Sequence, residues 1–313
     1  MKSSAVVATL IADPRSIRLS DAHIARLAQG VGGFDSQRWL DEGVAADLLF
    51  SAPLDAVRAA LTAALAGEPV DVIVQPAAHR AKRLLVADMD STLIGQECVD
   101  ELAASAGVGD RVAAITERAM RGEIAFEPAL RERVKLLAGL SESVIADVLR
   151  ERIMLSPGAR TLAFTMRARG AYVAIVSGGF RQFTAAVRDR IGADEDRANT
   201  LAIESGKLTG EVIEPILGHD AKLGALQAIA AAKGLALAET LAVGDGANDL
   251  AMLKAAGLGV AYRAKPKVAA NADARIDHAD LTALLYAQGI SRKEFVGGEE
   301  GPHPPAGAGR LLL

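Results

Sequence analysis

Apolar and polar positions in the first eighty residues alternate in the order of a small two-layer unit. The pattern predicts strands at 5–12, 37–42, 46–51 and 70–75, and helices at 20–29 and 53–66. Ser20 and Asp21 form a capping pair before the first helix, and Pro53 stands in the first turn of the second. The order strand, helix, strand, strand, helix, strand predicts an α+β unit of the ferredoxin-like type over residues 1–80.

After a polar, basic connector at 77–82, the pattern changes to short apolar runs that are separated by long helical segments. Strands are expected at 84–87, 172–176, 240–243 and 258–262. Strands that alternate with helices favour a parallel sheet with crossover helices. The sequence therefore predicts a second domain of the α/β class over residues 83–290.

Two stretches of this second domain are expected to be insertions. The region at about 99–150 is amphipathic and too long for one crossover helix, so it predicts an inserted helical cap. Residues 201–213 place a Ser-Gly-Lys turn between alternating segments, which predicts a β-hairpin. The tail at 296–313 is rich in Gly and Pro and is expected to be disordered.

Composition narrows the classes of partner. A net charge of −4 without any lysine-rich block argues against nucleic acid, and no apolar run is long enough for a membrane-spanning helix. The single cysteine, Cys98, excludes an intramolecular disulfide and a cysteine-based metal cage. Residues 1–12 are compatible with a β-strand and lack a convincing signal-peptide cleavage site, so a cytoplasmic location is the expectation.

The strongest chemical signal is the pair Asp88 and Asp90, directly after the apolar run 84–87. Two carboxylates at the end of one strand concentrate negative charge, which requires a cation or a proton. One carboxylate can attack phosphorus while the other transfers protons. Taken alone, the segment is equally compatible with a polar turn that caps a helix.

Further signals follow at the ends of other predicted strands. Ser177 and Gly178 follow the strand at 172–176, where a hydroxyl and free backbone amides could hold phosphate oxygens, although a simple tight turn is the alternative. Asp245 and Asp249 stand in a glycine-framed loop after 240–243. They are expected at the same sheet edge as Asp88, where hard oxygen ligands suit Mg²⁺.

Lys222 opens an apolar-patterned helix. A lysine at a helix start is usually solvated, and its charge is unfavourable against the helix dipole. In this context it could instead neutralise a phosphate and the attacking carboxylate together. Asn248 has two interpretations as well, a ligand of the substrate or a cap of the following helix.

These signals, in this order, resemble the haloacid dehalogenase superfamily over about residues 84–290. The resemblance implies a Rossmann-like core with a helical cap after the first motif. It implies that Asp88 is the nucleophile, which forms an aspartyl-phosphate, and that Asp90 is the general acid and then the base. The other implied roles are phosphate or substrate binding by Ser177, Gly178, Lys222 and Asn248, and Mg²⁺ ligation by Asp88, Asp245 and the main-chain carbonyl of Asp90, with Asp249 in support.

Within that superfamily, residues 88–97, 115–124 and 126–134 are similar to the phosphoserine phosphatase family. The resemblance implies hydrolysis of O-phospho-L-serine to L-serine and phosphate, the last step of L-serine biosynthesis. Glu97 would pair with the substrate ammonium and Arg133 with its carboxylate, while Met120 and Phe126 would close the pocket. The alternatives are a helix-terminal acid for Glu97, a solvated charge for Arg133, and ordinary cap core for Met120 and Phe126.

Two other functions remain open. The chain could be a related phosphatase or phosphotransferase, such as one that passes phosphate to homoserine, or a non-catalytic amino-acid sensor that acts through residues 1–80. The order of elements in 1–80 looks like an ACT-like regulatory domain. The loop at 13–16, however, lacks the glycine that would bring backbone close to an amino-acid ligand. A scaffold or dimerising role, with a homodimer, is therefore an equal expectation.

Overall fold

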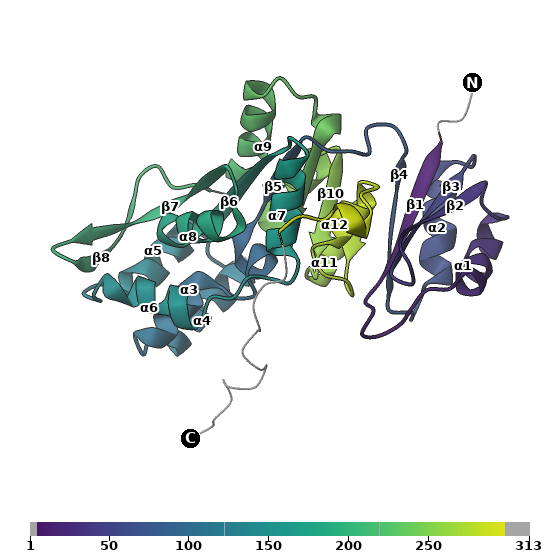
Figure 1. Cartoon of the computed structure of the whole chain (residues 1–313). Coiled ribbons are helices and arrows are strands. Elements are labelled where there is room, and N and C mark those ends of the chain that lie inside the picture. Colours follow the sequence, from purple (N-terminus) through teal and green to yellow (C-terminus); the bar gives the residue numbers. More distant parts are fainter. Residues whose placement is uncertain (1–4, 122, 219, 298–313) are drawn as a thin grey trace.

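The computed structural model describes residues 5–121, 123–218 and 220–297, and its strands form two separate sheets (Figure 1). A four-stranded antiparallel sheet has the order β2-β3-β1-β4, and a seven-stranded sheet has the order β11-β10-β9-β5-β6-β7-β8. The first sheet is built from the N-terminal quarter of the chain and lies beside the β11 end of the second.

The N-terminal unit contains every element that the sequence predicts there, with bounds shifted by at most two residues. The Ser20 hydroxyl accepts a hydrogen bond from the His23 amide at the start of α1, which confirms the capping prediction. The elements are β1 Val6–Ala12, α1 Asp21–Ala28, β2 Ser36–Asp41, β3 Ala45–Phe50, α2 Leu54–Ala64 and β4 Val70–Pro76.

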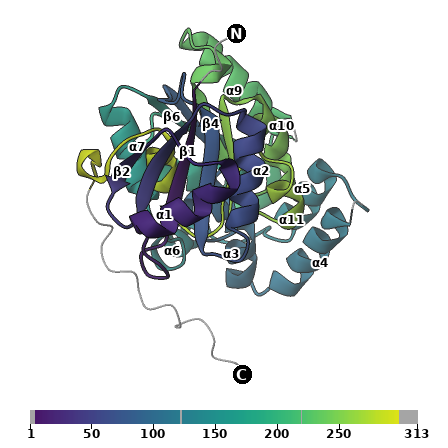
Figure 2. The ribbon, with the colours of Figure 1, turned by 90° about the vertical axis from the view of Figure 1, so that its right-hand side faces the viewer.

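Both faces of the four-stranded sheet are covered. Helices α1 and α2 lie on its outer face (Figure 2), where Leu10 and Leu48 pack against Leu27 and Leu61 in one cluster. On the other face, Ile11, Leu40, Ala45 and Ile73 belong to the main core of the larger domain. A strand that is buried on both faces has no polar side to show, which is why β1 is almost continuously apolar.

Buried polar side chains join the two units. The Arg80 guanidinium forms an ion pair with Asp47, 2.5 Å from Oδ1, and also donates to Thr9 Oγ1 and to the carbonyls of residues 286 and 287. The Asp71 carboxylate, 4% exposed, accepts hydrogen bonds from the backbone amides of residues 277, 278 and 279. The contact between the units is therefore specific, because Arg80 and Asp71 have defined polar partners across it.

The seven-stranded sheet is the parallel sheet expected for the α/β class, with the single antiparallel pair β7–β8 at one edge. Its strands are β5 Leu84–Ala87, β6 Tyr172–Phe180, β7 Glu195–Glu204, β8 Lys207–Ile213, β9 Thr240–Gly244, β10 Leu258–Tyr262 and β11 Ala274–Ile276. The four predicted strands are confirmed, but β6 runs four residues beyond the predicted end and β7 begins six residues before the predicted hairpin. The three-residue strand β11 was not predicted, because so short a run carries no periodic signal.

The register of the central strands brings the predicted motifs together. Ala87, at the end of β5, lies opposite Ile175 of β6 and Val243 of β9. The residues that follow these three strands therefore meet at one edge of the sheet. The chain order reverses around β5, and ligands of open α/β sheets bind at such a point.

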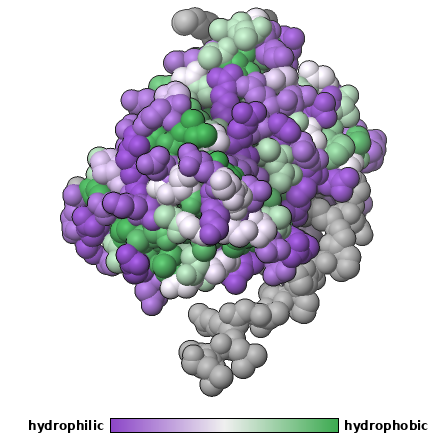
Figure 3. All heavy atoms as spheres, turned by 90° about the vertical axis from the view of Figure 1, so that its left-hand side faces the viewer, coloured by the Kyte–Doolittle hydropathy of each residue, from purple (hydrophilic) through white to green (hydrophobic). Residues whose placement is uncertain are grey.

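Helices α3 Cys98–Ser105, α4 Gly109–Met120, α5 Phe126–Lys135 and α6 Ser143–Glu151 occupy the region in which a cap was predicted. Helix α5 packs on β8, and a Cβ on Gly210 would stand 2.8 Å from that of Ala138. The β7–β8 hairpin projects from the body of the molecule (Figure 1), and this end is mostly hydrophilic with small separate apolar patches (Figure 3). The hairpin thus provides a platform on which the cap rests.

The remaining helices flank the parallel sheet. They are α7 Ala159–Ala168, α8 Arg181–Ile191, α9 Ala221–Ala232, α10 Leu250–Ala255, α11 Pro266–Ala269 and α12 Ala283–Ala287. No helix among the described residues has the length and apolar character that a membrane span requires. Of the tail that was expected to be disordered, Val296 is instead hydrogen-bonded to Thr165, and residues 298–313 lie outside the described part.

The Asp71 contact generates a prediction about stability. Replacing Asp71 with Ala leaves three backbone amides, that of Ala279 buried and the other two partly buried, without their acceptor, so the free energy of unfolding should fall by about 2–4 kcal/mol. Asp55→Ala is the matched control, because Asp55 is exposed and forms only a 3.5 Å surface pair with Arg58. Denaturant unfolding of the full chain measures both, and equal effects would contradict a specific role for the Asp71 contact.

Candidate active site

Three buried carboxylates gather where β5 and β9 end. Asp88 follows β5 directly, and its amide donates to the carbonyl of Val243 on β9. Asp245 follows β9, and Asp249 lies one turn further along the chain. One oxygen of each carboxylate lies within 4.8 Å of the other two. Among the described residues, this is a group of oxygen ligands that fits a hard divalent cation.

Lys222, the second residue of α9, is buried among these acids. Its Nζ lies 2.5 Å from Asp88 Oδ2 and 2.6 Å from Asp249 Oδ1. Burial alone would lower the pKa of the Lys222 ammonium, but the two carboxylates outweigh burial and raise that pKa. The lysine therefore stays charged in the interior. The solvated alternative that its position allowed is wrong.

The acids respond to one another and to burial. Burial and the negative charge of Asp249 raise the pKa of Asp88 well above its usual value, although Lys222 acts against this. Burial and the charge of Asp249 also raise the pKa of Asp245 to about 6. One ammonium is too little positive charge for Asp88, Asp245 and Asp249 together, so the site favours a further cation.

The loop after β9 holds its acids by close backbone packing. The Asp249 carboxylate accepts a hydrogen bond from the Gly246 amide, and a Cβ on Gly244 would stand 2.3 Å from Asp249 Cγ. Glycine is required at 244 because the carboxylate occupies the space of a side chain. Thr92 adds a hydroxyl, which donates to Asp245 Oδ1 at 3.3 Å.

Asp90 lies beside this group, and its carboxylate is directed toward Cys98 and Ser177. Its Oδ1 accepts from the Cys98 amide at 3.0 Å, and its Oδ2 lies 3.5 Å from Ser177 Oγ. Burial and the charge of Glu97 raise the pKa of Asp90 to about 6. A carboxyl group with that pKa can both give and take a proton near neutral pH.

Ser177 and Gly178 line a small cavity of about 30 Å³ between the cap and the sheet edge. Phe126 of α5 covers the cavity, so close that a Cβ on Gly178 would stand 3.2 Å from the ring. Lys222 and Asn248 line the same cavity. The side chain of Met120, the last residue of α4, lies outside the described part. The cap is therefore closed here, with space for little more than a water molecule.

Glu97 and Arg133 bring opposite charges to the Asp90 side of the site. The Glu97 carboxylate accepts a hydrogen bond from Ser91 Oγ at 2.7 Å, and Ser91 itself has a φ of +53° in the turn after Asp90. Burial lowers the pKa of the Arg133 guanidinium below its usual value, although the nearby charges of Asp100, Glu97 and Asp90 act against this. Arg133 thus faces the acidic side of the site rather than solvent alone.

Sequence reasoning did not identify four further groups at the site: Ser91, Thr92, Gly179 and Asn199. Gly179 admits the Asp90 carboxylate, since a Cβ there would stand 2.6 Å from Asp90 Oδ2. Ser91 and Thr92 lie inside the motif at 88–97, and Gly179 directly follows Gly178, so these three could have been proposed from the sequence. Asn199 could not, because it comes from a strand with no motif of its own.

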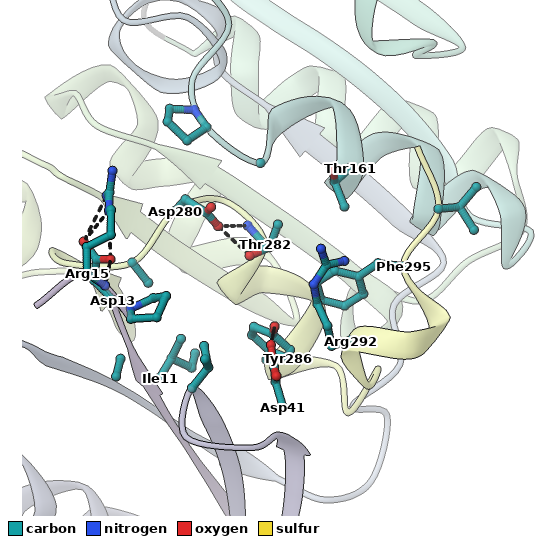
Figure 4. Close-up of a pocket in the computed structure, with 17 residues that line it drawn as sticks. Ile11, Asp13, Arg15, Asp41, Thr161, Asp280, Thr282, Tyr286, Arg292 and Phe295 are labelled. Carbon is teal, nitrogen blue, oxygen red and sulfur yellow. Dashed lines mark hydrogen bonds and ion pairs between the residues drawn. The ribbon is translucent and has the colours of Figure 1, made fainter. Parts of the chain in front are cut away.

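A second cavity, of about 500 Å³, lies between the N-terminal unit and the region around α7 and α12 (Figure 4). None of its lining residues belongs to the predicted site. Its carboxylates are held by neighbours: Asp13 by Arg15, Asp280 by Thr282 and Asp41 by the Tyr286 hydroxyl. These internal pairs give the cavity no reactive arrangement comparable with that around Asp88.

Comparisons with known proteins agree with this geometry. The family model of the haloacid dehalogenase-like hydrolases matches residues 85–254. A phosphoserine phosphatase of Streptomyces coelicolor is 48% identical over 240 residues, which are 76% of this chain and 58% of that protein. The chain thus spans about three fifths of the length of that curated relative.

Two solved structures extend the match. A probable phosphoserine phosphatase from Vibrio cholerae in its unliganded form has a TM-score of 0.74 at 34% identity, over 95% of this chain and 91% of that one. A phospho-aspartyl intermediate analogue of a phosphoserine phosphatase has a TM-score of 0.61 at 41% identity, over 66% of this chain and 98% of that one. The chain therefore belongs to the haloacid dehalogenase-like hydrolases and, within them, to the phosphoserine phosphatase family.

Proposed function

We propose that the chain hydrolyses O-phospho-L-serine to L-serine and phosphate with Mg²⁺ as its cofactor. The observation that carries the proposal is the pairing of a buried cluster of Asp88, Asp245, Asp249 and Lys222 with a carboxylate and a guanidinium beside it. The cluster suits a phosphoryl group, and Glu97 and Arg133 suit the two charges of an amino acid. The names of the relatives support the same substrate.

The first half-reaction begins with Asp88. A carboxylate oxygen of Asp88 attacks phosphorus, the bond from phosphorus to the serine oxygen breaks, and Asp90 gives its proton to that oxygen. Lys222 stabilises the charge that accumulates on the phosphoryl oxygens, together with the Ser177 hydroxyl and the backbone amide of Gly178. The raised pKa of Asp90 keeps a proton available for the leaving group.

In the second half-reaction, Asp90 takes a proton from water, which attacks phosphorus and releases Asp88. Mg²⁺, held by Asp88, Asp245 and the main-chain carbonyl of Asp90 with Asp249 in support, would neutralise phosphate charge and orient the phosphoryl group. The closed cap at Phe126 keeps other water away from the intermediate, so substrate entry requires the cap to move. A homodimer and a cytoplasmic location stay predictions from the sequence.

Substrate preference tests the proposal. Phosphate release should be fastest from O-phospho-L-serine, and kcat/KM should be lower by about 100-fold for O-phosphoethanolamine, which lacks the carboxylate, and for 3-phosphooxypropanoate, which lacks the ammonium. Asp88→Asn should release no phosphate from any of them, because an amide is a poor nucleophile. Equal turnover of the three esters, or transfer to added homoserine in place of release, would contradict the proposal.

The role of Arg133 can be separated from general damage to the cap. Arg133→Met should raise KM for O-phospho-L-serine by about tenfold or more and leave KM for O-phosphoethanolamine nearly unchanged, because only the first has a carboxylate. Arg131→Met is the control, since Arg131 lies on the same helix but pairs with Glu214 at the surface. If both substrates weaken equally in Arg133→Met, the guanidinium does not bind the carboxylate.

The proposed metal site predicts a stability effect that does not depend on turnover. Mg²⁺ at about 100 times its dissociation constant should stabilise the chain by about 2.7 kcal/mol, measured as a rise in unfolding temperature, and a chelator should reverse the rise and abolish activity. Asp245→Asn should lose most of this shift. Asp189→Asn, an exposed carboxylate on α8, should keep it. A shift that survives Asp245→Asn would place the metal elsewhere.

A further inference from the structure

Strand β6 is interrupted where it forms the predicted phosphate loop. Its pairing with β7 runs in regular steps to Val176 opposite Arg197 and resumes at Phe180 opposite Asn199. Between these points β6 advances four residues and β7 only two, so residues 177–179 bulge out of the ladder. The bulge takes the backbone of these residues out of the ladder, so that the Gly179 amide donates to Ser177 Oγ at 2.9 Å. It also removes the neighbouring strand as a partner for the Gly178 carbonyl.

The side chain of Asn199 replaces that partner. It is 1% exposed, and its Nδ2 donates to the Gly178 carbonyl at 2.9 Å. Its Oδ1 accepts from the Leu217 amide at 2.7 Å. A carbonyl only accepts and an amide N–H only donates, so these two partners fix the orientation of the Asn199 amide.

The two partners of Asn199 both line the same cavity. Gly178 lies in the bulged loop, and Leu217 precedes α9, whose second residue is Lys222. The link continues to α9 through the Ala221 amide, which donates to the Gly218 carbonyl at 3.1 Å. One buried amide therefore connects the loop that would hold phosphate oxygens to the segment that carries the ammonium.

We propose that Asn199 is a positioning residue that sets the distance between the phosphate loop at 177–179 and Lys222, and so determines affinity for the phosphoryl group. The inference rests on the proposed function only in assigning a phosphoryl group to this cavity. Asn199 touches neither reacting atom. Its effect on phosphate binding is transmitted through its hydrogen bonds to Gly178 and Leu217. Glu97 and Arg133, which would bind the amino-acid end of the substrate, are not connected by these hydrogen bonds.

The chain offers a matched control, a side-chain amide that contacts the same strand. Gln182 of α8 uses its side-chain amide in the same way, donating to the Leu201 carbonyl at 3.0 Å and accepting from the Leu201 amide at 3.3 Å. Leu201 lies two residues beyond Asn199 in β7, and neither Gln182 nor Leu201 lines the cavity. Loss of the Gln182 amide therefore measures the structural cost of such a bridge without the link to phosphate.

The test compares Asn199→Asp with Gln182→Glu. Each change keeps the shape of the side chain and removes its donor. For Asn199→Asp, KM and the inhibition constant of inorganic phosphate should both rise by about tenfold or more, while the inhibition constant of L-serine changes by less than about twofold. Gln182→Glu should change neither inhibition constant, even where it lowers the unfolding temperature by the same amount.

The proposal would be overturned if Asn199→Asp raised the inhibition constants of phosphate and L-serine equally. It would also be overturned if Gln182→Glu raised the inhibition constant of phosphate as Asn199→Asp does. If Asn199→Asp fails to fold, Asn199→Ala is used instead. Hydrogen exchange of the Leu217 amide is then measured in the folded variants. That amide should exchange faster in Asn199→Ala than in Gln182→Ala, and equal rates would overturn the link. The assay uses whichever phosphomonoester the unmodified chain turns over, so an error in the substrate is seen separately from an error about Asn199.

Discussion

The buried ammonium of Lys222 is the contact on which the site depends. It lies between Asp88 and Asp249 at hydrogen-bonding distance, in a position where any one of these charges alone would be costly. The carboxylates keep the lysine charged, and the lysine opposes the rise in the pKa of Asp88 that burial and Asp249 cause. Since the arrangement still holds more negative than positive charge, it favours a metal ion and a phosphoryl group over a neutral ligand.

The parallel sheet makes this arrangement possible. Asp88, Asp245 and the loop at 177–179 are far apart in sequence, and the register of β5 against β6 and β9 brings them to one edge. The cap then adds Arg133 and Phe126 from one side, and α9 adds Lys222 from another. None of the described residues of the N-terminal unit belongs to the site. Its inner face packs on the core through Asp71 and Arg80, so its sheet is a docked element rather than a free surface.

Much of this arrangement follows from sequence because its parts are local. Strand ends, helix caps and the acidic motifs are each encoded within a few residues, and the fold class follows from their order. The contacts that were missed join distant segments. Asn199 reaches Gly178 and Leu217, 21 and 18 positions away, and Asp71 reaches residues 277–279, more than 200 positions away. A polar residue in a strand predicts no partner by itself, since the partner depends on how the strands pack. The bulge in β6 was missed for the same reason, because two glycines mark a turn without giving its register.

The central claim is that Asp88 forms a covalent bond to the phosphoryl group of O-phospho-L-serine. It is tested most directly by quenching the enzyme in acid during turnover and locating the phosphoryl group by mass spectrometry of its peptides. The account predicts one added phosphoryl group on the peptide that contains Asp88, and none in Asp88→Asn. Phosphate release without any phosphorylated peptide, or with the phosphoryl group on another residue, would contradict it.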